Sequence, residues 1–212
     1  MRVLDIFRFS TIRLQVNLAA FELSTETLSE RYNLNVEILD INNDAQISTW
    51  CDIINNSYTE FNFNIVSART FLKDESYYKK TVTYLFTDNC TGDYCATISV
   101  GQYAKSPKVG GDFKIGVRKE FQGKGLGRLV ILYGFSRLKE RGLEVGESAI
   151  QIKRDTSLYL HFKLGFRPQY KPRYFALPAS SKLYSIIKFF PLLKLRRAYN
   201  KFIDKENRKF NT

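Results

Sequence analysis

Hydrophobic and polar positions along the chain fall into two kinds of pattern, one typical of strands and one typical of helices. Residues 81–87 and 94–103 are rich in β-branched and aromatic residues, and turn-forming residues from Asp88 to Asp93 separate them. This arrangement predicts two strands joined in an antiparallel hairpin. Gly110-Gly111 predicts a further turn, and 113–117 a third strand.

Helical spacing is found on both sides of these strands. Before them, apolar residues recur at intervals of three and four on one face of a predicted helix: Ile47, Trp50, Cys51 and Ile54. Asp44 is placed to cap this helix, and Ser67 to cap a second, shorter one. After the third strand, a helix is predicted from Leu126 to about Arg141, where Gly142 ends it.

The remaining elements complete the order of the fold. Strands are expected over 36–41, over 148–152 and from Gly165, with a short helix over 156–164. This order predicts an α/β fold, an α+β mixed sheet with helices on both faces. The chain is expected to divide into an N-terminal extension, a single domain and a basic amphipathic tail: 1–33, 34–179 and 180–212.

The composition suits a packed domain with an anionic partner. The 212 residues are 44% hydrophobic and include 17 Phe and 13 Tyr, which argues against a disordered chain. The formal net charge of +12 fits nucleic acid, a membrane surface or a phosphorylated cofactor equally well. More than half of the positive excess lies in residues 180–212.

Cysteine usage and hydropathy limit the class of protein. Cys51, Cys90 and Cys95 are odd in number and lack paired spacing, so neither a disulfide framework nor a metal site is predicted. No stretch approaches the roughly 20 apolar residues of a membrane span. Charged residues interrupt the apolar run at the N-terminus, which argues against a signal peptide. We expect a cytoplasmic protein, at most peripheral at the inner membrane surface.

A glycine-rich segment lies between the strand that ends at Val117 and the following helix: Gln122-Gly123-Lys124-Gly125-Leu126-Gly127. Glycines let the backbone approach a phosphate closely, and the first amides of a helix lack internal partners and favour negative charge. Lys124 and Arg128 add positive charges. The segment therefore predicts an anion cradle, although neither the P-loop nor the dinucleotide fingerprint fits it. A flexible surface turn is the alternative interpretation.

Two motifs carry a resemblance to a known family. Gln122-x-x-Gly125-x-Gly127 resembles the Arg/Gln-x-x-Gly-x-Gly/Ala signature of the GNAT superfamily of acyl-CoA N-acyltransferases. Downstream, Leu160-His161-Phe162-Lys163-Leu164-Gly165-Phe166 is similar to the family's Leu-Tyr-Glu-Lys-Leu-Gly-Phe segment. The predicted order of elements over roughly 34–177 resembles that of the family as well. The resemblance implies a GNAT-like fold that binds acetyl-CoA.

The resemblance also implies roles for the matching positions. The signature amides would hold the cofactor pyrophosphate, and the preceding strand would contact the pantetheine and polarise the acyl carbonyl. The corresponding residues are Ile115, Gly116 and Val117 on the strand, and Gln122, Gly123, Lys124, Gly125, Leu126, Gly127 and Arg128 in the signature. Arg154 stands where a family Asn often contacts the pantetheine arm. Either that contact is lost, or Arg154 serves a phosphate or a substrate carboxylate.

The candidate catalytic side chains have a weaker sequence context. His161 stands where the family commonly has Tyr as general acid for the leaving thiolate, and an imidazole could donate or accept that proton. A helix residue with a satisfied hydrogen bond is the other interpretation. Asp112 lies near the strand that often supplies the base for the amine, and Glu147 and Glu60 are further candidates. Each carboxylate could equally be solvated, with water as the base.

The last segment reads as two helices divided by Pro191, over 182–190 and 192–203. Apolar residues share one face and basic residues another, which suits an anionic membrane surface. A terminal helix packed on the domain explains the pattern equally well. Nucleic acid is the third alternative, because no recognition motif accompanies the charge.

These features predict an N-acetyltransferase that moves an acetyl or longer acyl group from acetyl-CoA to a primary amine by direct attack, without a metal. The acceptor could be a small molecule or a protein. No motif identifies the acceptor, the acyl chain length or the oligomeric state. The alternative is a non-catalytic GNAT-like module that binds an anionic membrane or nucleic acid through its basic tail.

Overall fold

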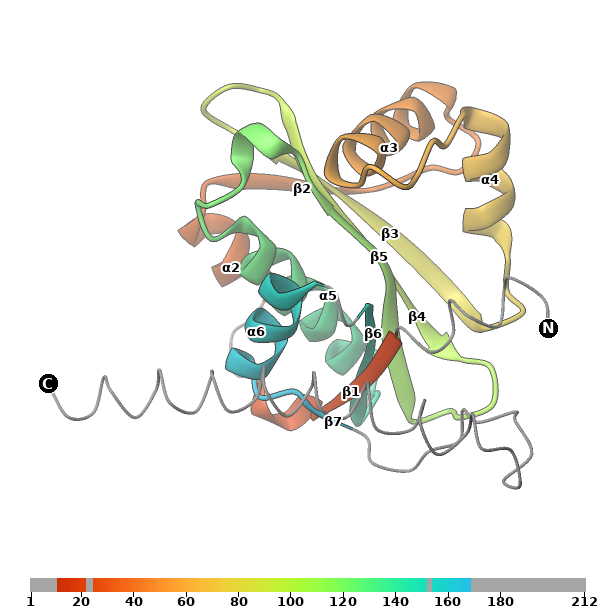
Figure 1. Cartoon of the computed structure of the whole chain (residues 1–212), viewed down its shortest axis with the longest axis vertical. Coiled ribbons are helices and arrows are strands. Elements are labelled where there is room, and N and C mark those ends of the chain that lie inside the picture. The colour runs from red at the N-terminus through yellow and green to blue at the C-terminus, as the bar shows by residue number, and fades with distance from the viewer. Residues whose placement is uncertain (1–10, 22–24, 152–153, 169–212) are drawn as a thin grey trace, which may run out of the picture. The chain divides into compact units, whose positions relative to one another are not determined.

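The computed structural model describes residues 11–21, 25–151 and 154–168 (Figure 1). The chain divides into two compact units. The larger covers 17–147, and the smaller joins 11–16 to the described residues from 148 onward. The predicted basic tail over 180–212 lies outside the described residues. None of the helices in the described ranges is long and apolar enough to cross a membrane.

The larger unit is built on a mixed sheet. Strand β4 (Tyr94–Tyr103) lies between β3 (Tyr78–Asp88) and β5 (Val109–Val117), and both pairings are antiparallel. On the far side of β3 lies β2 (Leu34–Ile38), also antiparallel. On the far side of β5, the first residues of β6 (Val145–Gln151) pair in parallel. The predicted hairpin is therefore confirmed.

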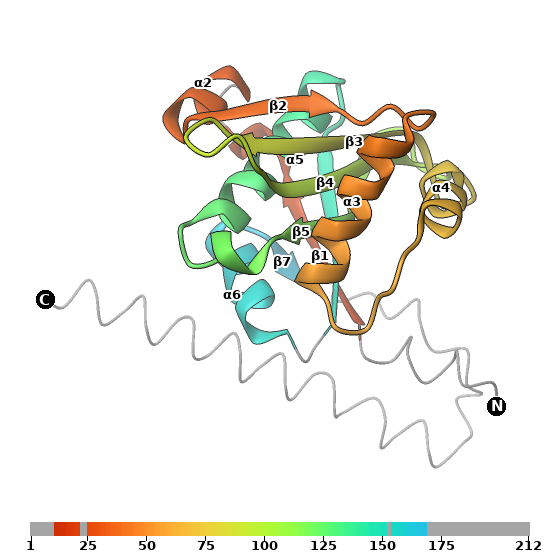
Figure 2. The same ribbon diagram turned by 90° about the horizontal axis from the view of Figure 1, so that it is seen from above.

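Helices cover both faces of this sheet (Figure 1). Helices α3 (Asp44–Ser57) and α4 (Ile65–Lys73) lie on one face, and Figure 2 shows α3 lying over the strands. Helices α2 (Thr25–Arg31) and α5 (Leu126–Glu140) lie on the other face. The predicted fold class, a mixed sheet with helices on both faces, is confirmed.

The apolar face predicted for the first long helix forms the core beneath α3. Ile47, Trp50 and Ile54 have no exposed surface, and Cys51 is 5% exposed. These side chains pack with Leu85 of β3. Burying one aliphatic or aromatic side chain of this size contributes about 1.5–3 kcal/mol, so α3 is held firmly against the strands that it covers.

Both predicted helix caps are wrong: the first lies one residue too late in the sequence and the second three residues too late. Asn43, not Asp44, caps α3, and its side chain accepts hydrogen bonds from the amides of Ala45 and Gln46. Asn64, not Ser67, caps α4; the two residues bond reciprocally as a capping box. In each case the capping residue is the last one with an extended backbone, whereas Asp44 and Ser67 are already helical.

The predicted turn at Gly110-Gly111 is wrong, because both glycines lie inside β5. Gly111 is opposite Gly101 on one side and Glu147 on the other. A Cβ at Gly111 would lie 2.5 Å from the carbonyl oxygen of Glu147 and 3.2 Å from the hydroxyl of Tyr78. The missing side chain therefore serves the close packing of neighbouring strands, not a reversal of the chain.

The smaller unit contains strand β1 (Thr11–Asn17), which pairs antiparallel with the short β7 (Arg167–Pro168). Between β6 and β7 lies helix α6 (Asp155–Lys163), which confirms the helix predicted over 156–164. Gly165, at φ +88°, follows the end of α6 and turns the chain toward β7.

Candidate active site

The glycine-rich segment connects the end of β5 to the start of α5 in the larger unit. A single turn of 3₁₀ helix, η2 (Lys119–Phe121), follows β5. Gly123 and Gly125 then adopt φ values of +80° and +85°. Residues with a side chain rarely adopt this left-handed conformation, so the path of the loop depends on these two glycines.

Hydrogen bonds fix the loop to the strands and to α3. The amide of Arg118 donates to the carbonyl of Cys95 across 2.9 Å, and the amide of Lys119 donates to Oδ1 of Asn56 across 2.8 Å. The side chain of Gln122, the first residue of the signature, turns back and donates to the carbonyl of Val117 across 2.9 Å. The loop is thus anchored before its glycines begin.

The start of α5 is open to an anion. Gly125 is the N-cap and supplies no side-chain cap, and no acidic residue lies in the first turn. Its carbonyl accepts from Arg128 and Leu129. Five successive amides have no hydrogen-bond partner among the described residues: those of Gly123, Lys124, Gly125, Leu126 and Gly127. Free amides and the helix dipole together favour a bound anion here.

Two cationic side chains lie beside these amides. Lys124 and Arg128 are both exposed, and the Nζ atom of Lys124 lies 5.2 Å from the centroid of the Phe121 ring. The amide of Arg128 already bonds to Gly125, as does that of Gln122 to Lys119. For Gln122 and Arg128, the predicted contact with the pyrophosphate therefore depends on the side chain, because the amide is already bonded.

Strand β5 pairs with β6 only at the beginning of both strands. Their pairing runs from Val109 opposite Val145 to Gly111 opposite Glu147. From 112 to 117, no pairing of β5 with β6 is found in the part of the chain that the structure describes. Over 112–117 this edge of β5 has no strand partner among the described residues, and we refer to it as the open edge of β5.

The pairing of β5 with β4 determines which backbone groups face the open edge. Because Arg118 donates to Cys95, these two residues form a hydrogen-bonded pair, and the pattern alternates along an antiparallel ladder. Gly116 is then bonded to β4, whereas Ile115 and Val117 direct their amides and carbonyls to the opposite edge. Of the three strand residues predicted to hold the cofactor, Ile115 and Val117 thus direct their backbone groups to the open edge, as that role requires.

Side chains from the end of α3 confirm this orientation. Ser57 Oγ donates to the carbonyl of Val117 across 3.0 Å, and the hydroxyl of Tyr58 donates to the carbonyl of Ile115. Gly116 has a different role, since a Cβ there would lie 2.9 Å from Cδ1 of Ile54 and 3.0 Å from Ser57 Oγ. Its lack of a side chain lets α3 approach β5.

An ammonium group lies among aromatic rings on the α3 face of β5. The Nζ atom of Lys114 is 3.4 Å from the ring centroid of Phe61. Three more rings have centroids 5.3–5.8 Å from Nζ: those of Phe71, Phe63 and Tyr58. Attraction between a cation and aromatic faces holds the loop between α3 and α4 close to the strand.

A buried carboxylate lies where β5 and β6 are still paired. Glu147 is 4% exposed, and its Oε1 atom accepts from the hydroxyl of Tyr103 across 2.6 Å. Burial, with the neighbouring Tyr78 and Glu147, raises the pKa of Tyr103 far above its usual range. Tyr103 therefore stays protonated and donates to Glu147 at any physiological pH.

The two candidate carboxylates do not come together. Asp112 lies opposite Val100, which packs toward Gly134 of α5, and residues directly opposite in a ladder share a face. Glu147 lies opposite Gly111, on the face that carries Tyr78. Asp112 thus lies on the α5 face and is 8% exposed. Its predicted catalytic role stays a prediction.

His161 lies in α6 of the smaller unit and is 1% exposed. Nδ1 lies 2.8 Å from the carbonyl oxygen of Ser157, and the ring packs edge-on against Phe166. Burial lowers the pKa of His161 to about 4, so the ring is neutral near pH 7. A carbonyl can only accept, which places the single proton on Nδ1 and leaves Nε2 without one. As positioned, Nε2 has no proton to donate.

Arg154, also in the smaller unit, is the N-cap residue of α6. Its Nε atom donates to Oε1 of Gln151 across 3.3 Å, and the side chain is half-buried. The predicted contact of Arg154 with the cofactor stays a prediction, as does the acid role of His161.

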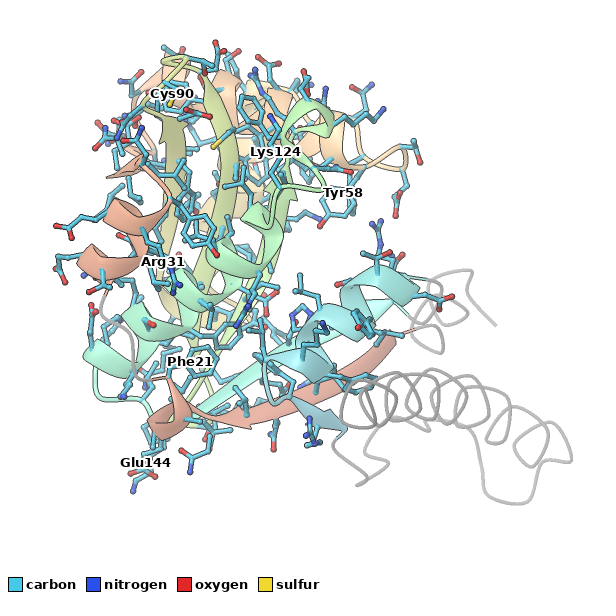
Figure 3. The ribbon with its side chains drawn as sticks, turned by 90° about the vertical axis from the view of Figure 1, so that its left-hand side faces the viewer. Phe21, Arg31, Tyr58, Cys90, Lys124 and Glu144 are labelled. Carbon is cyan, nitrogen blue, oxygen red and sulfur yellow. The ribbon has the colours of Figure 1, made fainter. Side chains whose placement is uncertain are left out.

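Sequence reasoning missed the contribution of α3 to this site. Ser57 and Tyr58 bond to the β5 edge, and Lys114 faces the aromatic loop. Figure 3 shows Tyr58 and Lys124 near the same end of the larger unit. The density of aromatic residues from Tyr58 to Phe63 was the available indication, but only the fold shows which strand they contact.

Known structures share the fold of this chain. A GCN5-related N-acetyltransferase from Sphaerobacter thermophilus aligns with a TM-score of 0.56 and 14% identity, over 75% of this chain and 48% of that chain. A putative GNAT acetyltransferase from Novosphingobium aromaticivorans aligns with a TM-score of 0.50 and 15% identity, over 75% and 60%. The chain thus spans less than two thirds of either protein, and at these identities the likeness concerns the fold. The comparison with curated proteins found no match.

The sequence itself matches a family model. The model of the acetyltransferase (GNAT) family matches residues 47–166, more than half of the chain. This range begins within α3 and ends after α6, and it includes the open edge of β5 and the glycine-rich loop. The resemblance that the two motifs indicated is therefore confirmed, and the chain belongs to the acetyltransferase (GNAT) family.

Proposed function

We propose that this protein transfers an acetyl group from acetyl-CoA to a primary amine. One observation carries the proposal: the open edge of β5 leads directly to the uncapped start of α5, through the shared residue Val117. A thioester with a phosphorylated tail needs these two features next to each other. GNAT proteins generally use acetyl-CoA, which agrees with this arrangement.

The residues of the site fit coenzyme A in two parts. The five free amides from Gly123 to Gly127 would hold the pyrophosphate, with Lys124 and Arg128 neutralising its charge. The amides of Ile115 and Val117 would bond the pantetheine and the acyl carbonyl along the β5 edge. Their carbonyls are already bonded by Tyr58 and by Ser57, so the orientation of the strand edge is set before the cosubstrate binds.

The reaction follows from this geometry. The uncharged amine attacks the acyl carbon, the C–N bond forms, and the C–S bond breaks with its electron pair moving to sulfur. A β5 amide at the acyl oxygen stabilises the negative charge that develops there, an effect typically worth about 2.7–4 kcal/mol per donor. The acetyl thioester supplies the activated acyl group.

The amine must also lose a proton. Glu147 lies on the α3 face, opposite Gly111, which is the last β5 residue that pairs with β6. We propose it as the proton acceptor, directly or through water, with Tyr103 orienting its Oε1 atom. Asp112, on the other face, is the second candidate.

Calorimetry and thiol release test the proposal in the full chain. Titration with acetyl-CoA should show saturable binding in the micromolar range. Thiol release should then require a primary amine, which a panel of an amino acid, glucosamine, spermidine and a peptide N-terminus would supply. No binding up to high micromolar acetyl-CoA would exclude the proposal. Binding without thiol release for any amine would favour the alternative, a non-catalytic module that acts through its tail.

A further inference from the structure

We propose that the phenol of Tyr58 gives its proton to the sulfur of coenzyme A as the thioester breaks. The inference rests on the proposed acyl transfer and adds a catalytic residue to it. An alkyl thiolate can leave without a proton, but a proton donor beside the sulfur speeds its departure and opposes its return to the acyl carbon, which is the role of a general acid.

The hydroxyl of Tyr58 lies on the open edge of β5. Tyr58 ends α3, where its amide bonds to Ile54 and its backbone turns to an extended conformation. Its hydroxyl donates to the carbonyl of Ile115, and the alternation of the β5–β4 ladder directs that carbonyl away from β4. The phenol oxygen therefore lies beside the backbone that would hold the acyl group.

Packing fixes the ring in this position. The preceding residue, Ser57, bonds to Val117, so the last residue of α3 and its C-cap hold two alternate carbonyls of β5. Gly116 lies between those carbonyls and has no side chain to push α3 away. The Phe61 ring packs edge-on against Tyr58 at a centroid distance of 5.3 Å. A group that donates a proton at one atom needs this kind of fixed geometry.

A cation lies near the Tyr58 ring. The Nζ atom of Lys114 lies 5.8 Å from the centroid of the Tyr58 ring. When Tyr58 gives up its proton it becomes a phenolate, and the ammonium charge of Lys114 stabilises that negative charge. The aromatic rings around Nζ hold the charge in place while the donor changes state.

The other candidate donors are less suited to this step. Nε2 of His161 carries no proton, because Nδ1 bonds to the carbonyl of Ser157. Tyr103 donates to Glu147, at the register where β6 still pairs with β5. Burial also raises the pKa of Tyr103 far above its usual range, which makes it a weak acid. Tyr58 is half-buried and bonds to a part of β5 that has no pairing with β6 among the described residues.

The step balances as follows. The amine nitrogen bonds to the acyl carbon, and the C–S bond breaks with its electron pair on sulfur. The O–H bond of Tyr58 breaks, its proton moves to that sulfur, and free coenzyme A leaves as a thiol. The nitrogen releases one proton to its base and then to water. Tyr58 takes one proton back from water, so the enzyme returns to its starting state.

Tyr58→Phe in the full chain tests the assignment, with thiol release measured for the most active amine of the panel. We expect kcat to fall about 100-fold, as for loss of a general acid, and KM for acetyl-CoA to stay within twofold. The wild type should lose kcat at alkaline pH as the phenol ionises, and the variant should lack this decline. Tyr77→Phe is the matched control, since Tyr77 is 50% exposed, and it should behave as the wild type.

A second variant covers the case in which Tyr58→Phe folds poorly. Site-specific 3,5-difluorotyrosine at position 58 keeps the shape of the ring and makes the phenol more acidic, so the alkaline decline of kcat should move to lower pH. A wild type that turns over while both variants keep its kcat and its pH profile overturns this assignment alone. A wild type that releases no thiol overturns the proposed function as well.

Discussion

The carbonyl oxygen of Val117 accepts from Gln122 Nε2 across 2.9 Å, so the first residue of the glycine-rich signature is bonded to the last residue of β5. The same oxygen accepts from Ser57 Oγ across 3.0 Å. One atom thus connects the strand, the loop and α3. Hydrogen bonds to this carbonyl oxygen therefore help to position both the loop that would bind the pyrophosphate and the helix that ends at Tyr58.

Gln122→Ala should weaken acetyl-CoA binding without unfolding the protein. The substitution removes one neutral hydrogen bond, worth about 1 kcal/mol, so Kd should rise about fivefold. Calorimetry measures the change. Gln102→Ala is the matched control, because Gln102 Nε2 donates in the same way to the carbonyl of Pro107. Equal affinities for the two variants would show that the signature glutamine does not position the loop.

Gly123→Ala should reduce cofactor binding more than it reduces stability. Gly123 lies at φ +80°, and no atom lies within 4 Å of the position that an added methyl group would take. The fold therefore loses only the backbone preference, about 1–2 kcal/mol. The methyl group, however, would stand where the backbone must approach a phosphate. We expect at least a tenfold rise in the Kd for acetyl-CoA by calorimetry.

Gly142→Ala is the control for this glycine effect. Gly142 also lies at φ +80° in open space, but it follows the other end of α5. A helix of 15 residues is about 22 Å long. The two variants should therefore lose similar free energy of unfolding in urea, and only Gly123→Ala should lose affinity. A parallel loss of affinity in both would point to general destabilisation.

The features of the site that depend on neighbouring residues in the sequence could be predicted, whereas those that depend on contacts between distant segments could not. The signature could be read from the sequence because glycine conformation and helix-end amides are local properties of Gly123 and Gly125. The positions of Asp112 and Glu147 on opposite faces could not, because register between strands decides them. A bulge near Phe113 adds one residue to β5 and changes which side chains face α3.

The same distinction explains the errors in the fold. Gly110-Gly111 has the composition of a turn, and local chemistry predicts one. Only the approach of Glu147 and Tyr78 from distant parts of the chain shows why side chains are excluded there. Tyr58 is a comparable case, since nothing local distinguishes it from the chain's other tyrosines until α3 is packed against Ile115.

The basic tail should direct the protein to anionic lipid. Replacing five basic residues by Gln in the full chain removes the charges without removing the segment: Lys194, Arg197, Lys201, Lys205 and Arg208. Because each basic side chain near an anionic surface contributes about 1 kcal/mol, binding to phosphatidylserine vesicles should fall at least 100-fold in a flotation assay. Vesicles of neutral phosphatidylcholine are the control. Unchanged binding to the anionic vesicles would exclude this role.

His161 should make stability depend on pH between about 4 and 6.5. Burial holds its pKa at about 4 in the folded protein, below the ordinary value of an exposed histidine. In this interval the unfolded chain binds a proton that the folded chain does not, so the free energy of unfolding rises with pH and reaches its full value above about 6.5. The change over the whole interval should be roughly 3 kcal/mol.

His161→Asn isolates this effect, because the amide can still donate to the carbonyl of Ser157 but does not titrate. Urea unfolding at pH 4.5, 5.5 and 7 should show a smaller pH slope for the variant than for the wild type. If the same variant also keeps kcat within twofold at pH 7, the imidazole acts in packing and not in proton transfer. An equal pH slope in both proteins would mean that His161 gains its proton without unfolding. In that case Nε2 is accessible to a proton in the folded protein, and His161 is again a candidate for the general acid that protonates the leaving thiolate.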